Sequence, residues 1–126
     1  MRNEIKIKFK DPEYFVNEEK GIVVCNLHYY VDYPRDLAKV FYWTVDTSPV
    51  RGVCKAVAKL GEGETFDLNV GKKVSLAKAE QKAYNKVFKY CLKAINNCAG
   101  MIEKLHNFAE KAVRVIDHNE EYISKF

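Results

Sequence analysis

The sequence predicts an α+β domain, in which an N-terminal antiparallel four-stranded sheet precedes a C-terminal antiparallel hairpin of two long helices. The first observation is that residues 4–60 contain short alternating apolar segments, separated by turns rich in Pro, Gly and Asp. The second is that residues 67–123 carry apolar side chains at helical spacing. The third is the length, because 126 residues suit one domain with a single core. We therefore expect residues 1–126 to form one domain.

Alternating residues predict the first two strands. Residues 4–10 alternate strictly and end at Asp11-Pro12. A longer strand over residues 22–31 follows a polar turn at residues 17–21. Side chains of one face of each strand are expected to enter the core. They are Ile5, Ile7 and Phe9 in the first strand, and Val23, Cys25, Leu27, Tyr29 and Val31 in the second.

Two further strands are expected between residues 40 and 60. The third covers residues 40–46 and the fourth residues 52–60, with turn chemistry before each. Short connections imply an antiparallel meander. In the third strand Phe41, Trp43 and Val45 are expected inside and Tyr42 and Thr44 outside, and in the fourth Cys54, Ala56 and Ala58 are expected inside.

Two long helices are expected after a break at residues 61–64. Asp67 is a good N-cap for the first helix, which runs to about Asn97, and Gly71 indicates a close approach to another backbone. Asn96, Asn97 and Gly100 predict a turn before a second helix at residues 101–123. So short a link implies an antiparallel hairpin. The facing apolar stripes are Tyr84, Val87, Phe88, Cys91, Ile95 and Cys98, and Leu105, Phe108, Ala112, Val115 and Ile116.

A lysine stripe runs along the first long helix. Its members are four, four, three and four residues apart, so they share one side of the helix and repel one another by about 0.2–0.5 kcal/mol per pair. One interpretation is a solvated face paired with acidic residues of the second helix, and the other is a basic groove for phosphates. The lysine stripe is Lys78, Lys82, Lys86, Lys89 and Lys93, and the acidic residues are Glu103, Glu110 and Asp117.

The outer face of the sheet is the second candidate surface. It mixes hydrogen-bonding groups with aromatic rings, as nucleotide binding requires. An ordinary half-polar face or a dimer contact is the alternative. Arg51 precedes the fourth strand and is placed to reach over this face. The expected outer-face residues are Asn26, His28, Tyr30, Tyr42, Thr44 and Lys55.

The composition argues against several classes of protein. The net charge of +4 favours anionic ligands weakly. No segment has the ~20 consecutive apolar residues of a membrane span, and no apolar run follows the N-terminus as in a secretory signal. The four cysteines are spread along the chain and are expected to be reduced thiols. No pair of them has the spacing of zinc ligands. No catalytic motif is present, so we expect no enzyme activity, no metal and no cofactor.

A local resemblance links residues 71–79, Gly-Lys-Lys-Val-Ser-Leu-Ala-Lys-Ala, to the last helix of double-stranded RNA-binding domains. That helix opens with lysines and continues with alanine-rich turns, and an antiparallel sheet precedes it. The resemblance implies a nucleic-acid-binding module that uses the lysine stripe. This is the alternative function.

A resemblance over nearly the whole chain concerns the phage Thoeris anti-defence sponges. Residues 61–67, Gly-Glu-Gly-Glu-Thr-Phe-Asp, leading into residues 71–79, are the part most similar to that family. The resemblance implies a non-enzymatic homodimer or higher oligomer in the cytoplasm of the host bacterium. It would sequester a cyclic ADP-ribose-type immune signal between its subunits and so block the Thoeris effector, with no role for nucleic acid or membranes. It also implies the ligand-binding residues Arg51, Tyr84, Phe88, Asn97, Arg114 and His28.

Overall fold

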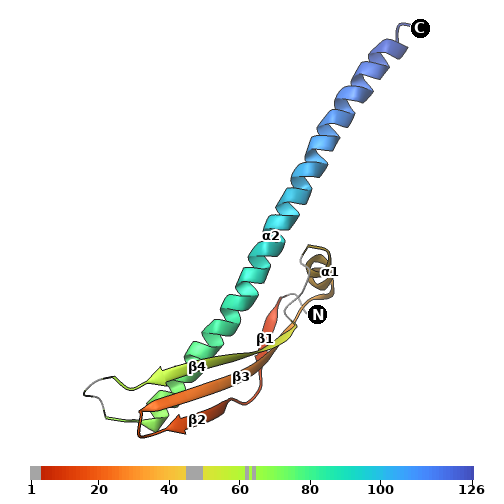
Figure 1. Cartoon of the computed structure of the whole chain (residues 1–126). Helices are drawn as coiled ribbons and strands as arrows, with labels where there is room; N and C mark the ends of the chain where they lie inside the picture. Colours follow the sequence, from red (N-terminus) through yellow and green to blue (C-terminus); the bar gives the residue numbers. More distant parts are fainter. Residues whose placement is uncertain (1–3, 45–49, 62, 64) are drawn as a thin grey trace.

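The protein forms a four-stranded antiparallel sheet crossed on one face by a very long C-terminal helix (Figure 1). The computed structural model describes residues 4–44, 50–61, 63 and 65–126. The α+β class, the four antiparallel strands and the long helix at the C-terminal end are therefore confirmed. The elements are β1 (Lys6–Phe9), β2 (Glu13–Asn17), β3 (Ile22–Asp32), α1 (Arg35–Thr44), β4 (Arg51–Lys59) and α2 (Leu68–Ile123).

β3 is the central strand and pairs with the other three. β4 covers one edge of β3 along nine residue pairs, from Ile22↔Lys59 to Tyr30↔Arg51. On the other edge, β2 pairs with the first half of β3 and β1 with the second half. Asp11-Pro12 separates β1 from β2, since proline has no N–H to donate to a ladder. The predicted meander is therefore wrong in its order, because β1 and β2 share one edge of β3.

The region between β3 and β4 is helical, which corrects the predicted strand at residues 40–46. α1 begins after Pro34, whose carbonyl accepts a hydrogen bond of 3.0 Å from the N–H of Ala38. Leu37 and Val40 recur at helical spacing. The fourth strand of the sheet is instead β2, which was not predicted. Side chains of Phe41, Tyr42, Trp43 and Thr44, and all of Val45 and Asp46, lie outside the described residues.

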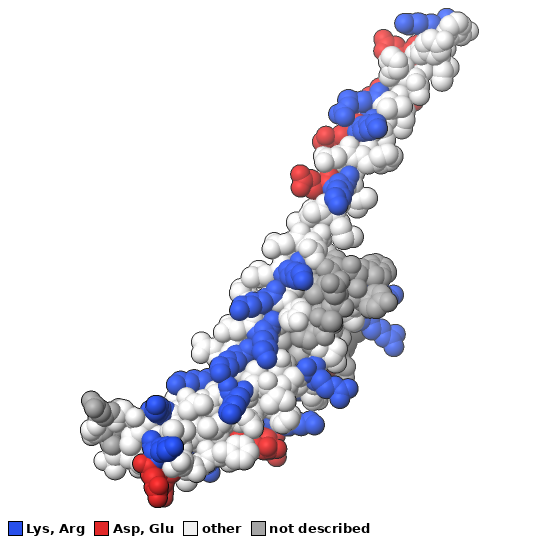
Figure 2. Space-filling view, in the orientation of Figure 1, with Lys and Arg blue, Asp and Glu red and all other residues white. Residues whose placement is uncertain are grey.

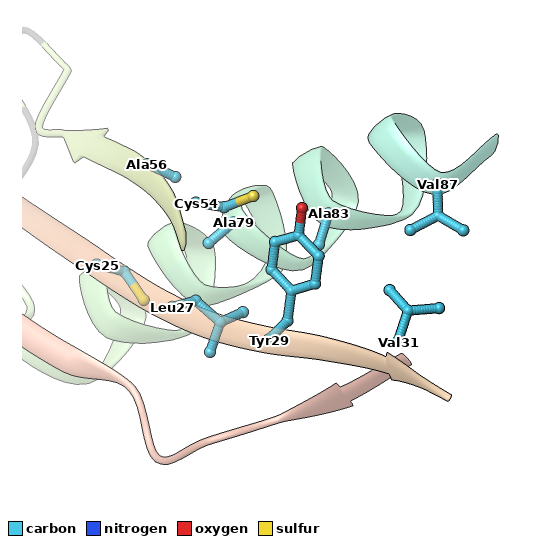
Figure 3. Close-up of a cluster of buried hydrophobic side chains, with 9 residues drawn as sticks. All are labelled: Cys25, Leu27, Tyr29, Val31, Cys54, Ala56, Ala79, Ala83 and Val87. Atoms are coloured by element: carbon cyan, nitrogen blue, oxygen red, sulfur yellow. The ribbon is translucent and has the colours of Figure 1, made fainter. Parts of the chain in front are cut away.

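The core lies between the sheet and the first half of α2. β3 and β4 contribute alternate side chains, and α2 contributes one small residue per turn, so the helix lies close to the strands (Figure 3). Ile7 and Phe9 of β1 pack against this cluster, which confirms their predicted inward direction. The buried cluster is Cys25, Leu27, Tyr29, Val31, Cys54, Ala56, Ala79, Ala83 and Val87.

The start of α2 matches its sequence signals. The carboxylate of Asp67 accepts hydrogen bonds from the N–H groups of Asn69 (3.0 Å) and Val70 (3.3 Å), so the predicted N-cap is confirmed. Gly71 lies so close to Val23 that a Cβ on this glycine would come within 2.6 Å of that side chain. The close approach predicted at Gly71 is therefore made to a side chain of β3.

α2 continues without a turn through residues 96–100, so the predicted hairpin is wrong. The helix has 56 residues, which corresponds to ~84 Å at ~1.5 Å per residue. Gly100 destabilises a helix by about 1 kcal/mol relative to alanine. This cost is too small to end the helix when long helical segments extend on both sides of the glycine. It does not adopt the positive φ of a helix-ending glycine. The second half of α2 consequently projects alone beyond the sheet and α1 (Figure 1).

Candidate functional site

The predicted ligand-binding residues fall into two groups. Arg51 and His28 lie in the same pocket on the outer face of the sheet. Tyr84 and Phe88 are exposed on α2, where the Tyr84 ring lies 6.1 Å from the ring of Phe9. Asn97 and Arg114 are also on α2, ~25 Å apart along the helix axis, since they are 17 residues apart. Within one chain, the six residues do not form a single site.

The outer-face pocket combines cationic groups with an aromatic ring. Strand register places Arg51 opposite Tyr30, so their Cβ atoms are about 5 Å apart. His28 is the next outward residue of β3, and Lys10 donates its backbone N–H to the carbonyl of His28 at 2.9 Å. The pocket is lined by Lys10, His28, Tyr29, Tyr30, Val50, Arg51, Gly52 and Val53.

Two lysines lie near this pocket: Lys10 lines it, and Lys8 lies beside the ring of Tyr30. Lys8 lies 5.9 Å from the centroid of the Tyr30 ring and 3.9 Å from a carboxylate oxygen of Asp32. One face of the ring is therefore in contact with a cation. Sequence reasoning missed Lys10, although the alternation of residues 4–10 assigns it to the outer face. Its position beside His28 depends on strand register, which the sequence did not reveal.

A second hollow lies between the free edge of β4 and the lysine stripe. It is lined by Val53, Cys54, Lys55, Lys82, Asn85, Lys86 and Lys89. Val53 lines both hollows, so they adjoin around the edge of β4. We call the two hollows together the basic band.

The first two lysines of the stripe are tied to β4. The ammonium group of Lys82 donates to the carbonyl of Lys55 at 2.6 Å, and that of Lys78 donates to the carbonyl of Val57 at 3.2 Å. These bonds satisfy acceptors on a strand edge that would otherwise be open to pairing with another chain. They also fix the direction of the stripe relative to the sheet.

The predicted pairing of the lysine stripe with Glu103 and Glu110 is wrong for a single chain. Because α2 is straight, Glu103 lies ~15 Å beyond Lys93 along the axis. In the described part of the chain, Lys86 and Lys89 form no ion pair with a carboxylate. Figure 2 shows a row of blue side chains along α2 beside the sheet, whereas on the projecting half red and blue side chains alternate; other red side chains lie at the lower end of the sheet. The basic band therefore presents uncompensated positive charge.

The rest of the predicted outer face is only partly present. Asn26 and Lys55 are paired across β3 and β4 and point away from the core. Tyr42 and Thr44 belong to α1 and are not part of the sheet, which corrects that prediction. The outer face is thus formed by β1, β2, β3 and β4, and residues 40–44 belong to α1.

The thiols are separated from the imidazole of His28. Cys25 and Cys54 are buried on the helix-covered face, whereas His28 points to the opposite face. Burial, and to a lesser extent the nearby Glu80 carboxylate, raise the pKa of the Cys25 thiol. A thiolate–imidazole pair is therefore not formed by these residues. Among the residues that the structure describes, no three His, Cys, Asp or Glu side chains gather as possible metal ligands.

Comparison with known proteins assigns no family. No protein-family model, curated protein or solved structure matches the chain significantly. In the described ranges, no helix combines the length and the apolar character needed to cross a membrane. The functional argument therefore depends on the residues of the basic band.

Proposed function

We propose that this chain is a non-enzymatic phage anti-defence protein that binds and sequesters a cyclic ADP-ribose-type signalling nucleotide, so that the Thoeris effector of the host bacterium is not activated. The observation that supports binding of such a ligand is the outer-face pocket, where Arg51, His28 and Lys10 surround the ring of Tyr30. The resemblance to the sponge family supports the choice of nucleotide and of sequestration.

The pocket has the chemistry that a nucleotide needs. Arg51 offers the planar, bidentate donor set that phosphate oxygens accept. Tyr30 is 43% exposed, so its ring has surface available for stacking against a base. The walls Val50 and Val53 are apolar, and pockets with mostly apolar walls and few converging polar groups are typical of small-molecule sites.

The test is ligand binding by native mass spectrometry and calorimetry with purified full-length protein and cyclic ADP-ribose isomers. The proposal expects binding, and recovery of the unaltered nucleotide after heat denaturation. Arg51→Ala should weaken binding at least tenfold, because a charge-assisted bidentate contact is lost. Arg35→Ala is the matched control, since Arg35 is exposed on α1 away from the pocket. No binding of any isomer, or release of a hydrolysed product, would refute the proposal.

Nucleic-acid binding is the second candidate, and the uncompensated charge of Lys55, Lys86 and Lys89 favours it. Phosphate-dominated binding should weaken steeply with salt, with a slope of about −0.7 per neutralised phosphate on single strands. Lys86→Ala combined with Lys89→Ala removes two phosphate contacts and should therefore reduce the magnitude of the slope by about 1.4. Arg51→Ala should instead weaken binding of the small nucleotide more than binding of nucleic acid. Absence of a complex with RNA or DNA at low salt would exclude this candidate.

A further inference from the structure

An apolar seam runs along α2 with a seven-residue repeat. Its members alternate at spacings of four and three residues from Tyr84 to Ile123, the pattern of positions that face a partner helix in a coiled coil. On a straight helix such a repeat drifts by ~20° per heptad, so two helices stay in contact along it by winding around each other in a left-handed supercoil. The apolar seam is Tyr84, Phe88, Cys91, Ile95, Cys98, Ile102, Leu105, Ala109, Ala112, Ile116 and Ile123, with the polar Asn119 in the same repeat and Gln81 preceding it.

The sheet-bearing half of the seam has a few contacts within the chain, such as Tyr84 with Phe9 and Cys91 with the core, but the projecting half has none in the described part of the chain. Leu105 and Phe108 are both 69% exposed, and no other described element reaches the projecting half of α2. Seven side chains of the seam are more than half exposed, and together with the neighbouring Met101, Phe108 and Val115 they leave on the order of 1,000 Å² of apolar surface in water. This exceeds the few hundred Å² usual on a monomer and the ~800 Å² that each partner contributes to a standard interface.

We propose that a second copy of this chain covers the seam, with the two α2 helices antiparallel and related by a two-fold axis at the level of Gly100. The partner must carry an equally long seven-residue repeat, and α2 itself supplies one. With the axis at Gly100, the projecting half of each helix lies along the sheet-bearing half of the other. Both halves of the seam are then buried, and the interface is self-complementary.

This register pairs residues that suit each other. Gln81 meets Asn119 of the second copy, so the two polar members of the repeat can exchange amide hydrogen bonds. Such a polar layer specifies register in coiled coils. In the next layers inward, Tyr84 meets Ile116 and the large Phe88 meets the small Ala112. Shifting one helix by a heptad would instead oppose Asn119 to Val74, which leaves a buried amide without a partner.

The register also explains the apolar residues that flank the seam on one side. Met101, Phe108 and Val115 are seven residues apart and exposed. Antiparallel packing brings this row over the same row of the second copy, so Phe108 lies over Ala94, which has little side chain of its own. Ala94 is in an apolar groove between α1 and α2 whose other walls include Ile5, Leu37 and Val40. Phe108 of each copy would thus enter the groove of the other.

On the outer side of the pair, one position beyond the residues that flank the seam, side chains of opposite charge lie at matching levels. In this register Lys89 lies at the level of Glu110 of the second copy, and Lys82 at the level of Asp117. A parallel pair would instead turn the lysine side of one helix toward the apolar row formed by Val87 and Ala94, which offers no carboxylate.

Light scattering and cross-linking test the proposal. The purified full chain should have twice the 14.6 kDa mass of one copy. Leu105→Glu should convert it to a monomer, and the matched control Asn107→Glu, outside the seam, should leave the mass unchanged. A wild-type monomer at micromolar concentration would overturn the proposal, whatever the behaviour of the variants.

The relative orientation of the two α2 helices can be determined by cross-linking introduced cysteines in a variant that also carries Cys91→Ala and Cys98→Ala. A short bismaleimide should join two copies efficiently when Gln81→Cys and Asn119→Cys are present together, and poorly when either is present alone. Efficient cross-linking by Asn119→Cys alone would show parallel helices and overturn the antiparallel assignment. Because no nucleotide is involved, these results are independent of the proposed ligand-binding function.

Discussion

The two halves of α2 differ in the size and environment of their apolar residues. The first half faces the sheet with small residues, Ser75, Ala79 and Ala83, all fully buried. The second half carries large residues such as Leu105 and Phe108, all exposed. Small side chains let a helix approach strands that belong to the same chain, whereas large ones fill the grooves of a separate helix. The first half is thus stabilised within one chain, whereas the second half has the side chains that the proposed second copy would cover.

A leucine-to-alanine substitution in β3 beneath the first half, and another within the second half, should separate the two kinds of stabilisation. Leu27→Ala removes a side chain that is 1% exposed beneath the first half, and should lower the free energy of unfolding by about 2–5 kcal/mol. Leu105→Ala should leave the melting of the sheet domain nearly unchanged at concentrations where the protein is monomeric, and should weaken self-association. Urea unfolding with light scattering measures both. Equal losses of domain stability would contradict the comparison.

Hydrogen exchange should distinguish the halves by its dependence on concentration. Amides of the first half are protected by packing on the sheet, so their exchange should not change on dilution. Amides of residues 103–123 depend on the second copy, and should exchange at least tenfold faster once the protein is diluted to monomers. Mass spectrometry at two concentrations reads both regions in one sample, and Leu105→Glu should exchange rapidly at either. Slow exchange in dilute monomer would show that the projecting half is stable alone.

The contacts between the lysine stripe and β4 should make a smaller contribution. Lys82→Ala removes the 2.6 Å hydrogen bond to the carbonyl of Lys55, and should lower the free energy of unfolding by about 0.5–1 kcal/mol. Lys86→Ala is the matched control, because among the described residues the Lys86 ammonium group donates no hydrogen bond to β4. Thermal unfolding of the two variants measures the difference in their stability. An equal effect of the two substitutions would mean that relief of lysine repulsion dominates.

Alkaline pH should destabilise the sheet-bearing half gradually. Burial is the main cause that raises the pKa of Tyr29 above its usual 10.0 and the pKa of Cys25 above its usual 9.0. Because the folded-state pKa values are raised, this contribution to stability is complete below the ordinary values and is lost as pH rises through the folded-state values. Urea unfolding between pH 8 and 10 should show the decline, and Cys25→Ala should reduce it. Stability that increases with pH would contradict this.

Much of the fold follows from local patterns. Alternation located β1, β3 and β4, and capping chemistry located the start of α2 at Asp67. Residues 40–46 were misread because a short apolar run fits a buried strand and a short helix equally well. Pro34 directly precedes α1, and a proline is typical of a helix start, so this residue was a sequence signal for a helix here.

The hairpin was mispredicted for a different reason. Asn96, Asn97 and Gly100 resemble a turn, yet each weakens a helix by at most about 1 kcal/mol, and an uninterrupted hydrogen-bond ladder offsets this.

The candidate site depended on contacts between residues that are far apart in the sequence. Arg51 and His28 share a pocket because β3 and β4 pair in one register, and sequence alone did not specify which residues face each other.

The straightness of α2 at Gly100 has a consequence for how much protein a cell must make. If α2 bent back at Gly100, its second half would be covered by its own chain at any protein concentration, as in the closed monomer of a protein that can swap domains. A chain that stays straight obeys mass action, so its distal helix is shielded only once enough copies have accumulated. Early in synthesis the isolated molecules would therefore be the ones most vulnerable to proteases, and abundance itself would protect them.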